Sequence, residues 1–240
     1  YQQRYLELVE RLGPEARRWR PHPVLDQAPW GPLPRVNVSV KLSALHPYLD
    51  PIAPGLSAET VKERLRRILR SARAHAAHIQ LDMEDRRLKD LTLQVFMELC
   101  AEREFRESRD LGIVLQAYLR DAEADARRII DWARRRGTPV TIRLVKGAYW
   151  DYETAHARLE RWPVPVFEAK RETDASFERL TRLLLDAPDA VDLAVGSHNI
   201  RSIAHALAAR EAHGLPPGRV EYQTLYGMAT PLGKALTERG

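Results

Sequence analysis

The chain has 240 residues, of which 44% are hydrophobic and 30% are charged, and its formal net charge is +5. These values predict one large or two small globular domains, and the interleaving of acids with bases argues against nucleic-acid binding by this segment. The single cysteine excludes an internal disulfide and a cysteine-based zinc site, and no apolar run approaches the roughly 18 residues typical of a membrane span.

Helical and strand patterns alternate along the chain. Residues 1–35 predict a helix followed by a proline-rich connector, and residues 36–240 predict a barrel segment of six strands that are each followed by a helix. The strands are expected at 36–42, 79–83, 112–118, 140–145, 191–195 and 219–225. The helices that follow are expected at about 57–77 (capped by Ser57), 88–106, 122–136 (between Asp121 and Gly137), 174–185 and 200–213. A longer insert at 151–171 contains an irregular segment at 162–165, and a short final helix closes the chain. This alternation predicts a parallel sheet with right-handed crossovers.

The less apolar side of each strand helps to distinguish a barrel from an open sheet. On five strands this side carries a functional group near the C-terminal end: Lys41, Asp82, Gln116, Arg143 and His198. In a (β/α)8 barrel that side lines the interior and the chemistry gathers at the C-terminal mouth, whereas an open doubly wound sheet gathers ligand groups only at its switch point. We therefore predict an α/β fold, a (β/α)8 TIM barrel represented by about six βα units, and we expect the segment to be cut at both ends.

The strand at 140–145 predicts a binding site at its end. Arg143 lies on its less apolar side, and Lys146 and Gly147 follow directly. Charges at a strand end are costly to bury unless they meet an anion or a carboxylate. Tyr149 and Trp150 then either contact a flat aromatic ligand or pack against the rim of the sheet.

Three further positions allow both a structural and a functional interpretation. Asp82 either caps the following helix, or it pairs with a cation such as Lys41 or Arg143 or holds a substrate amine. Lys41 is either a Schiff-base lysine or a fixed positive charge, and we favour the fixed charge because a neighbouring carboxylate opposes the low pKa that a Schiff base needs. The pair His198-Asn199 either supplies a plain N-cap or marks a ligand site at a helix N-terminus.

Six segments, taken in order, resemble the proline dehydrogenase domain of the bifunctional proline utilisation A (PutA) family. They are VSVKLSALHP at 38–47, LDME at 81–84, VLQAY at 114–118, IRLVKGAYW at 142–150, SHN at 197–199 and YQTLYGM at 222–228. The part from Arg143 to Trp150 is the most specific. The resemblance implies a (β/α)8 barrel that binds FAD and oxidises L-proline to Δ1-pyrroline-5-carboxylate by hydride transfer to flavin N5, the first step of proline catabolism to glutamate.

The resemblance also implies roles for individual residues. Asp82 and Arg143 would be catalytic, and the substrate would be bound by Lys41, Asp82, Tyr149 and Leu225. The cofactor FAD would be held by Met83, Gln116, Arg143, Val145, Lys146, Gly147, Trp150, His198 and Asn199. No metal-binding residue is expected. The chain departs from the family at Ser197, where threonine is usual, and at Tyr226, where histidine is frequent.

The expected partners are L-proline, a quinone or other electron acceptor, and a covalently linked aldehyde dehydrogenase domain. We expect a cytoplasmic protein with peripheral association at the inner membrane. The isolated segment is expected to be inactive, because the family's last strand and the paired arginines that grip the proline carboxylate lie beyond Gly240. Two alternatives stay open: another barrel enzyme, such as a lysine Schiff-base aldolase using Lys41 or Lys146, and a non-catalytic basic binding module.

Overall fold

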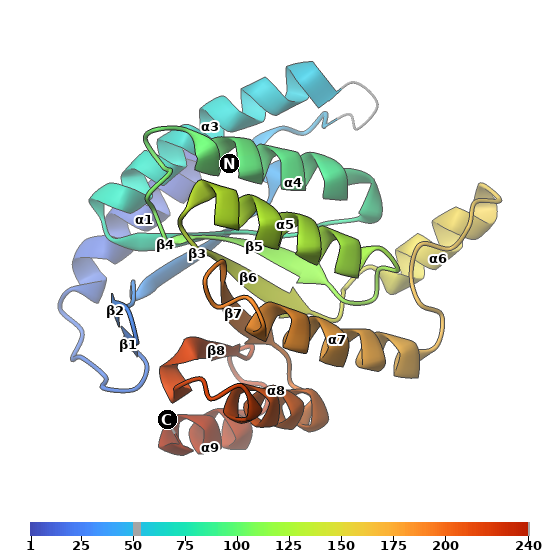
Figure 1. Ribbon diagram of the computed structural model, residues 1–240. Coiled ribbons are helices and arrows are strands. Elements are labelled where there is room, and N and C mark those ends of the chain that lie inside the picture. Colours follow the sequence, from blue (N-terminus) through green and yellow to red (C-terminus); the bar gives the residue numbers. More distant parts are fainter. Residues whose placement is uncertain (50–53, 240) are drawn as a thin grey trace.

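The structure, a computed structural model that describes residues 1–49 and 54–239, is built around a curled six-stranded parallel sheet (Figure 1). The strands occur in the order β3-β4-β5-β6-β7-β8, so each pairs with its neighbour in the sequence. They are β3 (Val36–Val40), β4 (Ala77–Leu81), β5 (Leu111–Gln116), β6 (Val140–Val145), β7 (Val191–Gly196) and β8 (Val220–Gln223). Together with the helices on its outer face, the sheet forms a half-barrel of the (β/α)8 type, as the sequence predicted.

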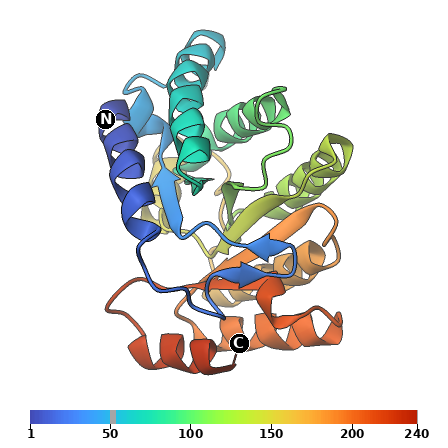
Figure 2. The same ribbon diagram turned by 90° about the vertical axis from the view of Figure 1, so that its left-hand side faces the viewer.

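Helices connect the strands and cover the outer face of the sheet (Figures 1 and 2). They are α1 (Gln2–Ala16), α2 (Leu42–Leu45), α3 (Pro54–Ala74), α4 (Arg86–Ala101), α5 (Ala122–Arg136), α6 (Trp150–Leu159), α7 (Lys170–Leu185), α8 (Ile200–Ala212) and α9 (Thr230–Arg239). A short antiparallel pair, β1 (Gln27–Ala28) and β2 (Gly31–Pro32), and a 3-10 turn (Pro217–Arg219) complete the described elements. None of the helices within residues 1–49 and 54–239 has the length and apolar composition needed to cross a bilayer.

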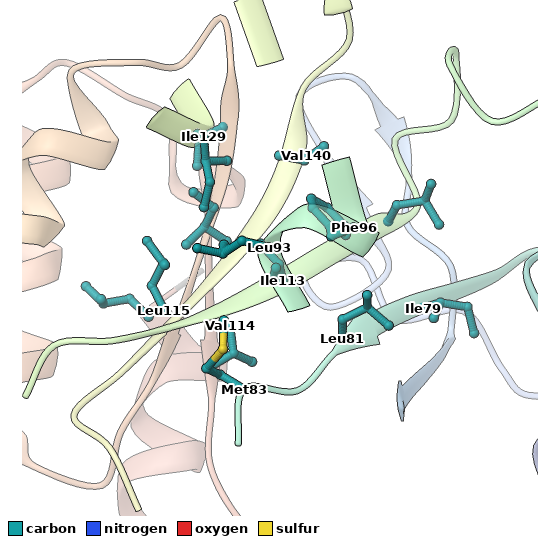
Figure 3. Close-up of a cluster of buried hydrophobic side chains, with 14 of the residues drawn as sticks. Ile79, Leu81, Met83, Leu93, Phe96, Ile113, Val114, Leu115, Ile129 and Val140 are labelled. Carbon is teal, nitrogen blue, oxygen red and sulfur yellow. The ribbon is translucent and has the colours of Figure 1, made fainter. Parts of the chain in front are cut away.

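The hydrophobic core lies between the sheet and the helices. On β6 the apolar residues Ile142 and Leu144 are fully buried, while the alternating Arg143 is only partly buried on the inner side. Figure 3 shows how side chains of α4, among them Leu93 and Phe96, lie against strand residues such as Ile113. Each large apolar side chain buried in this way stabilises the fold by about 1.5–3 kcal/mol. Because the apolar side of each strand packs against the helices, the polar side chains of the strands lie on the inner side of the sheet.

The local structure differs from the sequence prediction in three places. Helix α3 begins at Pro54, so Ser57 lies within its first turn and is not its cap; proline suits a first helical turn because its missing N–H has no helical partner there. Helix α6 occupies the first part of the insert expected at 151–171. It was missed because its buried residues Glu153, Thr154 and Ala157 are small or polar and give no apolar periodicity. The β1–β2 pair was likewise not predicted within the proline-rich connector.

The sequence predicted the C-terminal end of helix α5 correctly, but not the role of the residue at its N-terminal end. Gly137 follows it in the left-handed conformation with φ of 79°, as expected for a C-terminal glycine. Asp121 occupies the N-cap position, but its side chain does not bond a helix N–H. Its carboxylate instead pairs with Lys89 and Arg86 of α4, at 3.1 and 3.0 Å. Asp121, which was expected to cap α5, therefore links α5 to α4.

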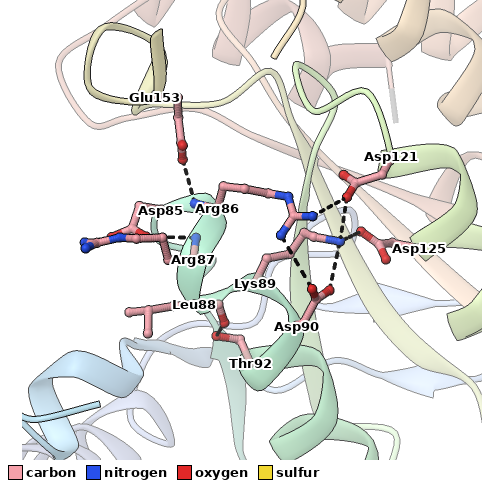
Figure 4. Close-up of polar contacts among 10 residues, drawn as sticks. All are labelled: Asp85, Arg86, Arg87, Leu88, Lys89, Asp90, Thr92, Asp121, Asp125 and Glu153. Carbon is pink, nitrogen blue, oxygen red and sulfur yellow. Dashed lines mark hydrogen bonds and ion pairs between the residues drawn. The ribbon is translucent and has the colours of Figure 1, made fainter. Parts of the chain in front are cut away.

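Lys89 is the centre of this ionic network (Figure 4). Only 3% of its side chain is exposed, and its Nζ lies 2.5 Å from Asp125 Oδ2, 3.1 Å from Asp121 Oδ2 and 3.1 Å from Asp90 Oδ1. Burial lowers the pKa of Lys89, but the hydrogen bond to Asp125 and the surrounding carboxylates outweigh burial and leave the pKa raised. The lysine therefore stays charged, and it joins the start of α4 to α5.

Substituting Lys89 with alanine is expected to lower the free energy of unfolding by about 3–5 kcal/mol, because the variant leaves Asp125 buried without its partner. The double variant Lys89→Met/Asp125→Leu removes both charges and should recover most of this loss. Denaturant unfolding of the three proteins measures the difference. Equal stability of the wild type and Lys89→Ala would show that the network contributes nothing.

Candidate active site

Arg143 connects distant parts of the sheet across the interior of the half-barrel. Its Nη1 donates to Ser39 Oγ on β3 at 2.9 Å and to Asp82 Oδ1, directly after β4, at 3.1 Å. Its Nε donates to Gln223 Oε1 on β8 at 2.6 Å. A guanidinium is planar, so acceptors on these sides fix both its position and its plane.

One part of the Arg143 guanidinium is left for a ligand. Among the described residues, no acceptor bonds to Nη2, and 17% of the side chain is exposed. Burial lowers the pKa of Arg143, with Asp82 acting in the opposite direction, but an arginine stays protonated at ordinary pH. An oriented cationic N–H pair at a partly open position is suited to an anionic or polar group.

Asp82 bonds to Arg143 and lies within electrostatic range of Lys41. Burial raises the pKa of Asp82 despite the opposing effects of Arg143 and Lys41. Asp82 does not cap the next helix, because the side chain of Asp85 does so by accepting from Arg87 N at 3.0 Å. The interpretation of Asp82 as a partner for a cation is therefore confirmed.

Lys41 reaches Tyr149, which follows β6. Its Nζ lies 3.4 Å from Tyr149 Oη. Burial lowers the pKa of Lys41, but the hydrogen bond to Tyr149 and the effects of Tyr149, Asp82 and Glu84 outweigh burial and leave the pKa raised. Lys41 is accordingly a charged group, which disfavours its use as a Schiff-base nucleophile.

Gly147 and Gln116 form another part of the same mouth. Gly147 has φ of 131°, and a Cβ added there would lie 2.5 Å from Cγ of Tyr118, so a side chain at 147 would collide with the ring. Gln116 is 2% exposed, and its Oε1 has no partner among the described residues. A buried acceptor without a partner requires an explanation, and a ligand N–H would satisfy it.

His198 and Asn199 shape the mouth beside β7 and β8. His198 Nε2 accepts from Leu225 N at 2.8 Å, which ties the segment after β8 to the start of α8. Asn199 Oδ1 accepts from Ser202 N at 3.0 Å, so Asn199 is the N-cap that one interpretation expected. Leu225 is 65% exposed.

Two predicted cofactor-binding side chains are engaged elsewhere. Lys146 Nζ lies 2.5 Å from Asp174 Oδ1 on α7, and Trp150 Nε1 donates to Phe167 O at 2.9 Å. The other two, Met83 and Val145, are buried and partly buried. The structure thus pairs Arg143 with Asp82 and Lys41 with Tyr149, and the charge of Lys41 also acts on Asp82. It joins His198 to the Leu225 backbone.

Ser39 and Gln223 stand on the less apolar sides of their strands, but the sequence analysis assigned them no function. Both bond directly to Arg143, at 2.9 and 2.6 Å. Their alternation with buried apolar residues was the available signal, since Val38, Val40 and Val220 lie on the core side.

A cavity of about 550 Å³ lies mainly at the opposite end of the sheet. His78, Thr141 and Asp192, near the starts of their strands, contribute to its lining. Catalytic groups of barrels of this type lie at the C-terminal ends of the strands. The polar cluster around Arg143, not this cavity, is therefore the candidate site.

Comparisons with known proteins agree on one family. A family model described as proline dehydrogenase matches residues 1–240. The bifunctional protein PutA of Escherichia coli is 32% identical over 202 residues, which cover 84% of this chain and 15% of the relative. Proline dehydrogenase 1 of Bacillus subtilis is 31% identical over 198 residues, which cover 82% of this chain and 58% of the relative.

A solved structure is similar over the full chain. It is proline utilization A from Bdellovibrio bacteriovorus inactivated by N-propargylglycine, which is 42% identical, with a TM-score of 0.97 over 100% of this chain and 25% of that chain. The chain thus spans 15% of the Escherichia coli relative and 58% of the Bacillus one.

The raised pKa of Asp82 predicts that its charge costs stability at neutral pH. The ordinary value for this carboxyl is 3.8, and a raised folded pKa means that the folded protein holds the proton more tightly than the unfolded chain. Relative to Asp82→Asn, which keeps an acceptor for Arg143, the wild type should lose stability as the pH rises above 3.8. Melting temperatures of both proteins between about pH 4 and pH 7 measure this. The prediction would be wrong if Asp82→Asn melted below the wild type at pH 7 and the difference in melting temperature became smaller in acid.

Gly147→Ala is expected to be more destabilising than Gly31→Ala. Gly31 has a similar φ of 129°, but a Cβ there would have no neighbour within 4 Å. The Gly31 variant therefore measures backbone strain alone, which costs about 1–3 kcal/mol. The Gly147 variant adds the collision with Tyr118. Equal losses in thermal denaturation would show that the ring gives way without cost.

Proposed function

The chain belongs to the proline dehydrogenase family, and on that premise we propose that the full-length protein oxidises L-proline to Δ1-pyrroline-5-carboxylate with FAD as its cofactor. The observation that carries the proposal is the Arg143 guanidinium, which is fixed by Ser39, Asp82 and Gln223 and keeps Nη2 for a ligand. FAD, when bound, supplies at N5 the acceptor for the hydride that leaves proline Cδ.

The residues at the mouth fit a flavin. Arg143 offers a fixed cation for the negative charge that a reduced flavin carries, and Gln116 offers a buried acceptor for a ring N–H. Gly147 allows a ligand to approach the backbone. The start of α8 at His198 and Asn199 offers helix N–H groups to a polar part of the cofactor. Met83, Val145, Lys146 and Trp150 complete the proposed cofactor-binding set.

The proposed substrate-binding residues are Lys41, Asp82, Tyr149 and Leu225. Lys41 stays charged and complements the carboxylate of proline. Asp82 complements its amine, and Tyr149 keeps Lys41 in place through their 3.4 Å contact. Asp82 and Arg143 are the proposed catalytic residues, because they bond to each other and lie where the substrate would meet the cofactor.

A Schiff-base aldolase is the second candidate, because Lys41 lies at a strand end of a barrel-type fold. Its raised pKa argues against this reaction, which needs a lysine that loses its proton readily. Borohydride trapping with a carbonyl substrate should give no adduct on Lys41 or Lys146. A trapped adduct would favour the aldolase.

The partners follow from the same proposal. An acceptor must take up the two electrons that are removed from proline. We infer a quinone at the inner membrane for this role, reached by a cytoplasmic protein that associates peripherally. PutA relatives are named bifunctional, which supports a second catalytic domain in the same chain. We infer that this is a covalently linked aldehyde dehydrogenase domain that acts on the product.

The test is the bleaching of the visible flavin absorbance by L-proline in the full-length protein under anaerobic conditions. Arg143→Met should lower kcat by about 100-fold, the loss typical of removing one charge-stabilising donor. Arg127→Met, an exposed arginine on α5, is the matched control and should keep wild-type activity. An unchanged kcat in Arg143→Met would overturn the assignment of Arg143, and a flavin that L-proline leaves oxidised would overturn the proposed reaction.

A further inference from the structure

Helix α6 begins directly after Tyr149 and projects from the side of the molecule in Figure 1. Its buried residues are Glu153, Thr154 and Ala157, which bring little apolar surface to an interface. Hydrophobic burial therefore contributes little to holding this helix, and individual polar contacts matter more.

The main buried polar contact of α6 comes from Glu153. Its residue is 4% exposed, and Oε1 accepts from Arg86 N at 2.6 Å (Figure 4). Arg86 is the first residue of α4, where backbone N–H groups lack helical partners and the helix dipole favours a carboxylate. Asp85, the N-cap of α4, bonds Arg87 N, so α4 starts between one carboxylate of its own and one from α6.

Burying this carboxylate is unfavourable by itself. Burial raises the pKa of Glu153 and Asp85 raises it further, while the bond from Arg86 N and the charges of Arg86 and Arg87 act in the opposite direction. Burying a charged group costs free energy unless hydrogen bonds offset the cost. A glutamate at this position thus calls for a role beyond filling space.

Both partners of the Glu153–Arg86 hydrogen bond lie within a few residues of the candidate site along the chain. Glu153 lies one helical turn after Tyr149, and Glu153 N donates to Tyr149 O at 2.9 Å. Arg86 lies four positions after Asp82. Strand β5 lies between β4 and β6, so the bond joins the segments that follow two strands that are not neighbours.

We propose that Glu153 is a positioning residue whose bond to Arg86 N holds α6 against α4 and thereby sets the spacing between Tyr149 and Asp82. Tyr149 bonds to Lys41, and Asp82 bonds to Arg143. A shift of α6 would carry Tyr149 with it and change the distance between these two pairs. The inference rests on the proposed function, because it takes these four residues to surround the substrate.

The test compares Glu153→Ala, Glu153→Gln and Asp151→Ala in the full-length protein. Glu153→Ala should raise the KM for L-proline about tenfold, the effect of losing one hydrogen bond that involves a charged group, with a much smaller change in kcat. Glu153→Gln keeps an oxygen that accepts from Arg86 N and should stay within about twofold of wild type. Asp151→Ala removes an exposed carboxylate from the same helix and should change neither constant.

Hydrogen exchange without substrate measures the anchor independently of activity. Amides of residues 150–159 should exchange faster in Glu153→Ala, and those of α8 should be unchanged. Faster exchange with an unchanged KM, unchanged exchange, or faster exchange throughout the protein would each overturn the positioning role. So would a glutamine variant as impaired as the alanine variant. A wild-type protein that does not oxidise proline would refute the proposed function, while the exchange experiment would still report on the anchor.

Discussion

The guanidinium of Arg143 bridges the two edges of the six-stranded sheet. Three acceptors from β3, the end of β4 and β8 meet it, and these strands include both edges of the sheet. Removing a guanidinium from water is unfavourable, and the oriented acceptors offset that cost. The same bonds fix the plane of the group and direct Nη2 away from the protein acceptors. The arrangement of polar groups at the mouth therefore depends on this one side chain.

The polar interior around Arg143 is unfavourable for stability. Burial raises the pKa of Asp82 and lowers the pKa of His78, on the inner side of β4, to about 4. His78 is thus neutral at pH 7, with Arg143 adding to the effect and a bond to Gln80 Oε1 at 3.1 Å opposing it. Such shifts gather where a protein holds charges for binding or chemistry. The apolar contacts on the outer face of the sheet supply the stability that the inner face lacks.

Helix starts organise the rim of the mouth. At α4, Asp85 and Glu153 bond backbone N–H groups of the first turn, and at α8 Asn199 does the same. Lys89 joins the start of α4 to Asp125 of α5 inside the protein. These contacts place successive βα connections at fixed positions relative to one another. The positions of Tyr149 and Asp82 are consequences of this frame as much as of the strands that carry them.

The sequence by itself determined the six strands of the main sheet and the side to which each strand residue points. Strand β6 has the predicted bounds 140–145, and Arg143 lies on the inner side because alternation along a strand is a local property. Which inner residues touch was decided by the tertiary structure. Ser39 and Gln223 lie 104 and 80 positions from Arg143, and only the curl of the whole sheet brings them to it. Lys146 illustrates the same limit, because its long side chain reaches Asp174 of α7. Helix α6 was missed because polar and small residues face the protein there, so it meets α4 through individual contacts such as Glu153 with Arg86 N and Arg87 over the Tyr152 ring, and not through an apolar pattern.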